Sequence, residues 1–199
     1  MSRLIESIKL LDGKFYNLFY HEQRMKRSLQ ALFGDHRKID LEKFLRDTDY
    51  PRHGLYKCRI VYDANFSEAS FSPYEAKRVE RVKVVEDDDI SYEFKFLDRS
   101  AINRLFDLRG DCDDVLIVRK GMVTDCSFSN VVFKSDGGVW YTPRSPLLEG
   151  TMRRNLLDQN RIQVREIQKR DIRSFDTFKI INAMLEFDSP EIEVSNIVF

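Results

Sequence analysis

Short runs of apolar and polar residues open the chain and then give way to helical spacing. Residues 4–9 form one such run, which ends at Asp12-Gly13, and residues 15–19 form a second apolar run. An Asp-Gly pair between two short apolar runs is typical of a β-hairpin. From 21 to 33 the apolar positions recur at helical spacing before a glycine, so the pattern predicts an amphipathic helix there.

The rest of the chain switches repeatedly between strand-like and helical segments. Strands are predicted at 54–62, 78–86, 91–96, 114–119, 130–134, 139–141 and 178–182, and further helices at 41–46, 101–108 and 152–160. The most polar interruption is the triple-Asp turn at 87–89, and we place a domain boundary just after it. The sequence therefore predicts an α+β chain of two domains, 1–90 and 91–199.

Charge and composition narrow the possible partners. Lysine and arginine together number 33, as do aspartate and glutamate, so the formal net charge is zero. Such a balance favours a small-molecule substrate over nucleic acid or an anionic membrane. The three cysteines form no close pair, which argues against disulfides and a zinc site. With no apolar signal segment and no apolar run approaching about 18 residues, we expect a soluble, cytoplasmic protein without a bound metal.

Two residues in the second half could carry chemistry. Lys95 stands in the run YEFKFLDR, where alternation places it opposite Phe94 and Phe96, and shielding from water favours the neutral, nucleophilic amine. Taken alone, such a lysine is far more often a solvated strand lysine. Asp125 follows at a predicted strand end, ahead of the small polar residues 127–130. Its carboxylate could hold a pyridine ring protonated, or could simply belong to a turn.

Two other segments could bind phosphate. Residues 150–153 (GTMR) precede a predicted helix, where backbone N–H groups and the helix dipole favour an anion, although Thr151 could also be an ordinary N-cap. Arg24 lies one turn into the first helix, on a basic face that is otherwise typical of a solvated surface. Together the four segments supply the lysine, carboxylate and phosphate donors that a pyridoxal-phosphate site needs.

In this order, the four segments resemble the class IV aminotransferase family. The matching residues are 21–25 (HEQRM), Lys95, 123–130 (VTDCSFSN) and 148–153 (LEGTMR), and the resemblance spans most of the chain. Further details are most similar to the aminodeoxychorismate lyases of that family: 95–99 (KFLDR), 124–126 (TDC), 141–144 (YTPR), 150–153 (GTMR) and 182–183 (NA).

The resemblance implies a two-domain fold. A small N-terminal α/β domain would be joined to a β-barrel-like, pyridoxal-phosphate-binding C-terminal domain with helices, and the cofactor cleft would lie between the two. Family members usually begin with a further strand pair, whereas this chain starts almost at the segment that matches residues 4–11. We therefore expect the N-terminal domain to be truncated at its start relative to the family.

The resemblance also implies a role for each site residue. Lys95 would bind pyridoxal 5'-phosphate covalently and move protons at the substrate carbon. Arg24 would grip the phosphate, with backbone donors from Thr151 and Met152, and Asn182 would also contact the cofactor. Asp125 stands where the family has a glutamate facing the pyridine nitrogen. Ser7 and Lys9 fall where family residues face the substrate, and Ser129 and Asn130 would support the strand behind the ring.

Three functions remain open at this point. The first is a lyase that converts 4-amino-4-deoxychorismate to 4-aminobenzoate and pyruvate. The second is an aminotransferase, a transferase of the branched-chain or D-amino acid type, acting on a small amino acid with the same residues. The third is a catalytically inactive homologue. The family resemblance also implies a homodimer, whereas no HExxH, GxSxG or P-loop pattern occurs to suggest another enzyme class.

Overall fold

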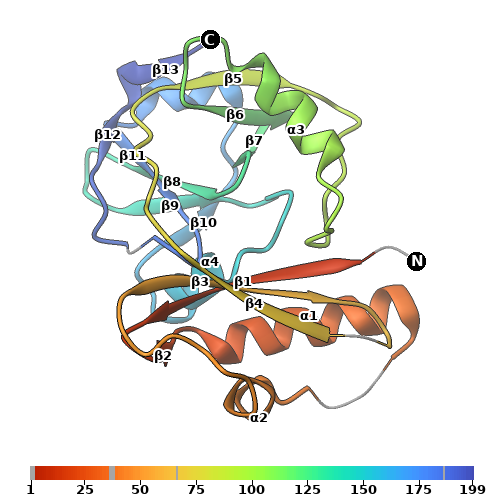
Figure 1. Cartoon of the computed structure of the whole chain (residues 1–199). Coiled ribbons are helices and arrows are strands. Elements are labelled where there is room, and N and C mark those ends of the chain that lie inside the picture. The colour runs from red at the N-terminus through yellow and green to blue at the C-terminus, as the bar shows by residue number, and fades with distance from the viewer. Residues whose placement is uncertain (1–2, 36–38, 66, 186) are drawn as a thin grey trace. The chain divides into compact units, whose positions relative to one another are not determined.

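The computed structural model describes residues 3–35, 39–65, 67–185 and 187–199. The chain divides into two compact units. One comprises Met1–Ala76 with Phe94–Asp98, and the other comprises Lys77–Glu93 with Arg99–Phe199. Figure 1 shows helices and strands in both units, which confirms the predicted α+β class.

An antiparallel sheet in the order β2-β1-β3-β4 is the framework of the first unit. Its elements are β1 (Leu4–Leu11), β2 (Lys14–Phe15), α1 (Leu18–Phe33), α2 (Leu41–Arg46), β3 (Leu55–Tyr62) and β4 (Ser67–Pro73). The turn between β1 and β2 places Asp12 and Gly13 at φ of 47° and 77°. Two-residue hairpin turns require such positive φ values, so the predicted hairpin is confirmed.

The core of the first unit lies between the sheet and its helices. Leu4 and Ile8 of β1 point to one face because side chains alternate along a strand, and they pack against Met25 and Leu29 of α1. The predicted amphipathic helix is confirmed, although it begins three residues earlier, at Leu18. The edge strand β4 was not predicted, because its residues are mostly exposed and show no apolar alternation.

The segment around Lys95 does not form the strand predicted at 91–96. Among the residues that the structure describes, a single isolated bridge, between Leu4 and Phe96, joins it to the sheet. The Ile5 N–H donates to the Lys95 carbonyl at 2.9 Å, and the Leu97 N–H donates to the Arg3 carbonyl at 2.8 Å. The alternating pattern was therefore misleading, since this stretch follows β1 through a few backbone contacts without forming a ladder.

A larger mixed sheet is the framework of the second unit. Strands run in the order β10-β9-β8-β7-β6-β5-β13, and β11 pairs with both β8 and β12. The elements are β5 (Val82–Glu86), α3 (Ser100–Phe106), η1 (Asp107–Arg109), β6 (Asp114–Arg119), β7 (Met122–Cys126), β8 (Asn130–Lys134), β9 (Trp140–Pro143), α4 (Thr151–Asp158), β10 (Gln163–Arg165), η2 (Lys169–Ser174), β11 (Thr177–Ile181), β12 (Ile192–Glu193), η3 (Val194–Asn196) and β13 (Ile197–Val198). Buried side chains such as Leu116, Phe133 and Phe178 fill its core.

The division between the units differs from the boundary expected after residue 90. Strand β5 pairs in parallel with β6 and β13, so residues 82–86 belong to the second unit. Residues 94–98, in turn, belong to the first unit because of their contacts with β1. Within the described ranges, no helix is long and apolar enough to cross a membrane.

Candidate functional site

A buried carboxylate in the first unit joins strand β1 to helix α1. The β1 alternation that points Leu4 and Ile8 into the core also points Glu6 there, and its side chain is fully buried. Arg24 donates from Nε to Glu6 Oε1 at 2.9 Å and from Nη2 to Glu6 Oε2 at 2.5 Å. His21, one turn earlier on α1, places Nδ1 at 2.6 Å from Glu6 Oε2. One carboxylate therefore holds two side chains of the His21-Arg24 segment.

The charges of this cluster follow from its burial and its partners. Burial alone would raise the pKa of the Glu6 carboxyl, but the Arg24 charge and the His21 hydrogen bond lower it to about 2. Burial lowers the pKa of His21 and outweighs the Glu6 hydrogen bond and charge, which raise it, while the Arg24 and Lys95 charges lower it further. His21 is therefore favoured as a neutral ring. Because an ionised carboxylate only accepts, the His21 proton must sit on Nδ1 and be donated to Glu6.

Lys95 belongs to the same unit as Arg24. Its carbonyl is fixed by the N–H of Ile5, the residue before Glu6, and its ammonium lies near enough to His21 to act on the pKa of that ring. Ser7 and Lys9 alternate with Glu6 and so point to the other face of β1, where Lys9 lies 4.9 Å from the centre of the Tyr16 ring. The structure thus gathers Arg24 and Lys95 near His21 and turns Ser7 and Lys9 away from Glu6.

A second buried carboxylate organises the second unit. Asp125, on β7, accepts at Oδ1 from Asn130 Nδ2 at 2.7 Å and at Oδ2 from the Leu148 N–H at 2.9 Å. Asn130 Nδ2 also donates to the Leu148 carbonyl at 2.8 Å. Burial raises the pKa of Asp125 to about 6, although these hydrogen bonds and the charge of Arg153 act against that rise. The carboxyl therefore ionises close to neutral pH.

The start of α4 comes shortly after Leu148, whose N–H donates to this carboxyl. Gly150 is the N-cap, and a Cβ there would overlap Asn130 Oδ1, so any other residue must displace the Asn130 side chain. Thr151 and Met152 are the first helical residues, and both are buried. Arg153 turns inward, donating from Nε to Thr142 Oγ1 at 3.1 Å and from Nη2 to the Pro143 carbonyl at 2.9 Å. The helix start is thereby tied to β9.

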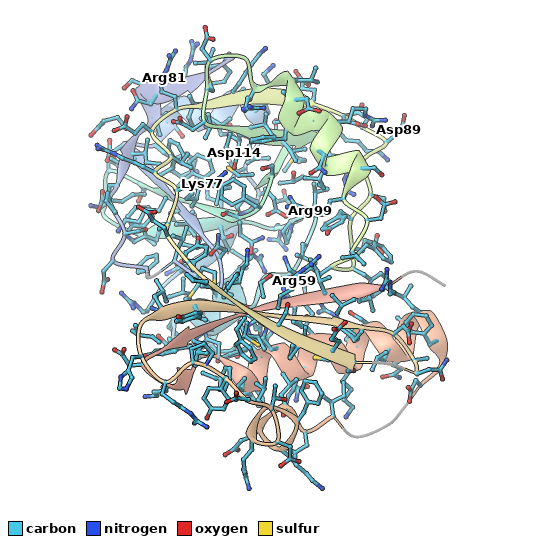
Figure 2. The ribbon with its side chains drawn as sticks, in the orientation of Figure 1. Arg59, Lys77, Arg81, Asp89, Arg99 and Asp114 are labelled. Carbon is cyan, nitrogen blue, oxygen red and sulfur yellow. The ribbon has the colours of Figure 1, made fainter. Side chains whose placement is uncertain are left out.

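The loop between β7 and β8 is held by several side chains. Arg99 donates from Nη2 to the Ser127 carbonyl at 2.6 Å, and the Ser127 N–H donates to Asp114 Oδ1 at 3.3 Å. Figure 2 labels Arg99 and Asp114 among the side chains of this unit. Asn182 donates from Nδ2 to Ser129 Oγ at 3.0 Å. The predicted residues Asp125, Thr151, Met152 and Asn182 therefore belong to one connected region.

Sequence reasoning missed some of the residues that orient the predicted ones. Glu6 carried a signal, because it is an acid at a core-facing position of an alternating strand. His21 belongs to the HEQRM motif, but the motif predicted no role for it. Asn130 was predicted only to support the strand behind the cofactor ring. No local sequence pattern predicts the contacts of Arg99 and Asp114 with Ser127, because these residues lie far apart in the chain. Among the described residues, no group of three or more His, Cys, Asp and Glu side chains could hold a metal ion.

Comparison with known proteins shows what the chain is similar to. Residues 93–187 match the family model described as amino-transferase class IV. An uncharacterized protein of Haemophilus influenzae is 40% identical over 186 residues, covering 92% of this chain and 98% of that protein. The crystal structure of a proposed 4-amino-4-deoxychorismate lyase from Haemophilus somnus superposes with a TM-score of 0.87 at 36% identity, covering 92% of this chain and 97% of that one.

A more distant structure shares the fold. A hypothetical aminotransferase from Mycobacterium tuberculosis, in a PLP-bound form, superposes with a TM-score of 0.75 at 17% identity. That match covers 98% of this chain and 81% of the other.

Replacement of Gly150 by alanine tests the close approach of α4 to Asn130. In Gly150→Ala the new methyl group must displace the Asn130 side chain, and we expect a loss of about 1–3 kcal/mol in the free energy of unfolding. Gly137→Ala is the matched control, because the nearest atom to its Cβ would be Ser135 Oγ at 3.8 Å. Urea denaturation measures both variants, and equal stability of the two would contradict the packing described.

The raised pKa of Asp125 predicts a pH dependence of stability. Its folded-state pKa is about 6 against a usual 3.8, so the folded protein holds this proton more tightly than the unfolded chain. Ionisation of Asp125 therefore costs stability above about pH 6, and the cost disappears below about pH 4. We expect the unfolding free energy of the wild type, relative to Asp125→Asn, to rise as the pH falls from about 7 to about 4. A flat difference over that range would be inconsistent with a raised pKa.

Proposed function

This chain belongs to the class IV aminotransferase family of pyridoxal-phosphate-dependent enzymes, and on that basis we propose that it is a lyase acting on 4-amino-4-deoxychorismate. The products are 4-aminobenzoate and pyruvate. The observation that carries this choice is the 36% identity to the proposed lyase of Haemophilus somnus over 97% of that chain. The lyase-like stretches around Lys95, Asp125 and Thr151 support it.

The donor set of the chain fits the cofactor. Arg24 offers a guanidinium that Glu6 already orients, and guanidinium groups bind phosphate through paired hydrogen bonds. The backbone N–H groups of Thr151 and Met152 lie at the start of a helix, where an anion is favoured. Asp125 is a buried carboxyl that would pair with a protonated pyridine nitrogen. We propose that these residues, with Lys95 and Asn182, hold pyridoxal 5'-phosphate.

Lys95 performs the proton transfers in this proposal. When bound, the cofactor supplies an electron sink for charge that develops at the substrate carbon bearing the amine. Lys95 Nζ removes the proton from that carbon as a general base, and the bond between the neighbouring ring carbon and the enolpyruvyl oxygen breaks. The enolpyruvate that leaves takes up a proton to become pyruvate, and the ring that remains is the aromatic ring of 4-aminobenzoate. Asp125 is buried away from water, which would strengthen the pairing of its carboxylate with a protonated ring nitrogen.

Ser7 and Lys9 are the residues we propose for substrate contact. They lie on the face of β1 opposite Glu6, and the Lys9 ammonium would meet a substrate carboxylate as a point charge. Lys9 is only 7% exposed, so its charge is screened less than that of a surface lysine.

Product analysis tests the lyase assignment. We expect the protein with pyridoxal phosphate to release 4-aminobenzoate and pyruvate in equal amounts from 4-amino-4-deoxychorismate. Lys95→Ala should abolish turnover because it removes the proton-transfer group, whereas Lys77→Ala, a change at an exposed lysine labelled in Figure 2, should leave it unchanged. Conversion of small amino acids to oxo acids without 4-aminobenzoate would identify an aminotransferase instead. Absence of both activities would favour an inactive homologue.

We also propose that the enzyme is a cytoplasmic homodimer, as the family resemblance implies. Sedimentation velocity of the cofactor-loaded protein should show a species of twice the chain mass of 23.6 kDa. A monomer at all concentrations would contradict this part of the proposal.

A further inference from the structure

We propose that Glu6 is a positioning residue that aligns the Arg24 guanidinium for the cofactor phosphate, so that its loss weakens binding of the phosphate group alone. The inference rests on the proposed function, because it assumes that Arg24 contacts that phosphate. Nothing in the HEQRM motif assigns a role to Glu6, which lies on a different element, β1. Its role follows from the contacts of its two oxygens.

The two hydrogen bonds from Arg24 fix the whole guanidinium plane. Glu6 Oε1 accepts from Nε and Oε2 accepts from Nη2, so the carboxylate lies along one edge of the group. Two parallel bonds to a planar fork remove its freedom to rotate or slide. The orientation of the fork is therefore set by the protein itself, before any cofactor phosphate arrives.

Glu6 is itself held in place and remains ionised. His21 donates to Oε2 from a fully buried ring, so the carboxylate has partners on both elements it joins. The pKa of about 2 keeps Glu6 charged at any physiological pH. The ion pair also compensates the charge of Arg24, which is only 6% exposed and would otherwise be costly to keep in this position.

Packing alone does not account for an ion pair at this place. The neighbouring core positions Leu4, Ile8, Met25 and Leu29 are all apolar. Replacing a buried ion pair by apolar residues of similar volume is often neutral or stabilising, so a buried pair is weak evidence for a purely structural role. A role in orienting a binding group explains why a carboxylate stands at position 6.

A comparison of pyridoxal phosphate with pyridoxal isolates the phosphate contribution. Both carry the same ring and aldehyde, but only the first has a phosphate. Absorbance titration of the wild type and Glu6→Gln gives a dissociation constant for each, with Lys95→Ala as the background for reaction at other lysines. We expect Glu6→Gln to weaken pyridoxal phosphate binding by about tenfold or more, which is the size of the loss in metal affinity when the partner that orients a metal ligand is removed. Pyridoxal binding should stay unchanged.

Two further variants serve as controls for this comparison. Glu22→Gln makes the same chemical change on α1, at a side chain that accepts from the Leu41 N–H at 2.7 Å, and it should alter neither affinity. In an Arg24→Lys background, Glu6→Gln should cause no further loss of pyridoxal phosphate affinity, because the guanidinium that Glu6 orients is gone. If Glu6→Gln does not fold, Glu6→Asp can replace it, because aspartate keeps the charge on a shorter side chain. Glu6→Asp should lose part of the preference for pyridoxal phosphate over pyridoxal.

The outcomes separate this inference from the proposed function. Equal weakening of both ligands by Glu6→Gln, or no weakening of either, would overturn the positioning role. The positioning role would also be overturned if Glu6→Gln weakened pyridoxal phosphate binding as much in the Arg24→Lys background as in the wild type. A wild type that binds pyridoxal and pyridoxal phosphate equally would instead remove Arg24 from the phosphate site, and the proposed cofactor site would fail with it.

Discussion

The buried Glu6 carboxylate constrains how strand β1 and helix α1 are arranged in the first unit. A buried charge is tolerated only when it is paired and hydrogen-bonded, so Arg24 and His21 must both face β1 from α1. A slip of one residue in the pairing of β1 with β3 would move Glu6 to the opposite face and leave Arg24 buried without it. The apolar core positions already set the strand register and the rotation of the helix, and within that frame the ion pair fixes the position of the Arg24 guanidinium.

The pKa of the buried carboxyl in the second unit shifts in the opposite direction. Burial raises the pKa of Asp125 to about 6, because its hydrogen bonds come from neutral donors, the Asn130 amide and the Leu148 N–H, and the Arg153 charge only partly opposes the rise. Glu6, with a cation in contact, has a pKa of about 2. The difference lies in the partner, because both groups are almost fully buried. A carboxyl without a paired cation is suited to receive one, which is the part that Asp125 plays in the proposed cofactor site.

Much of this arrangement could be predicted from the chain alone. The hairpin at Asp12-Gly13, the helix that carries Arg24 and the strand at 114–119 follow from local patterns, and the structure confirms them. The residues of the candidate site were predicted from four segments and from their resemblance to class IV aminotransferases, and their roles stay predictions. Glu6 was not assigned, because its role depends on Arg24, which lies on another element. The segment of Lys95 was predicted wrongly as a strand because its contacts are with β1, about ninety residues earlier.

The central claim is that Lys95 carries the cofactor, and covalent labelling tests it most directly. Purified protein would be mixed with pyridoxal phosphate, reduced with borohydride and digested, and the modified peptide would be mapped. We predict a visible absorption band before reduction and a single label on Lys95, the half-buried lysine beside His21. No band, or a label spread over exposed lysines, would contradict the account.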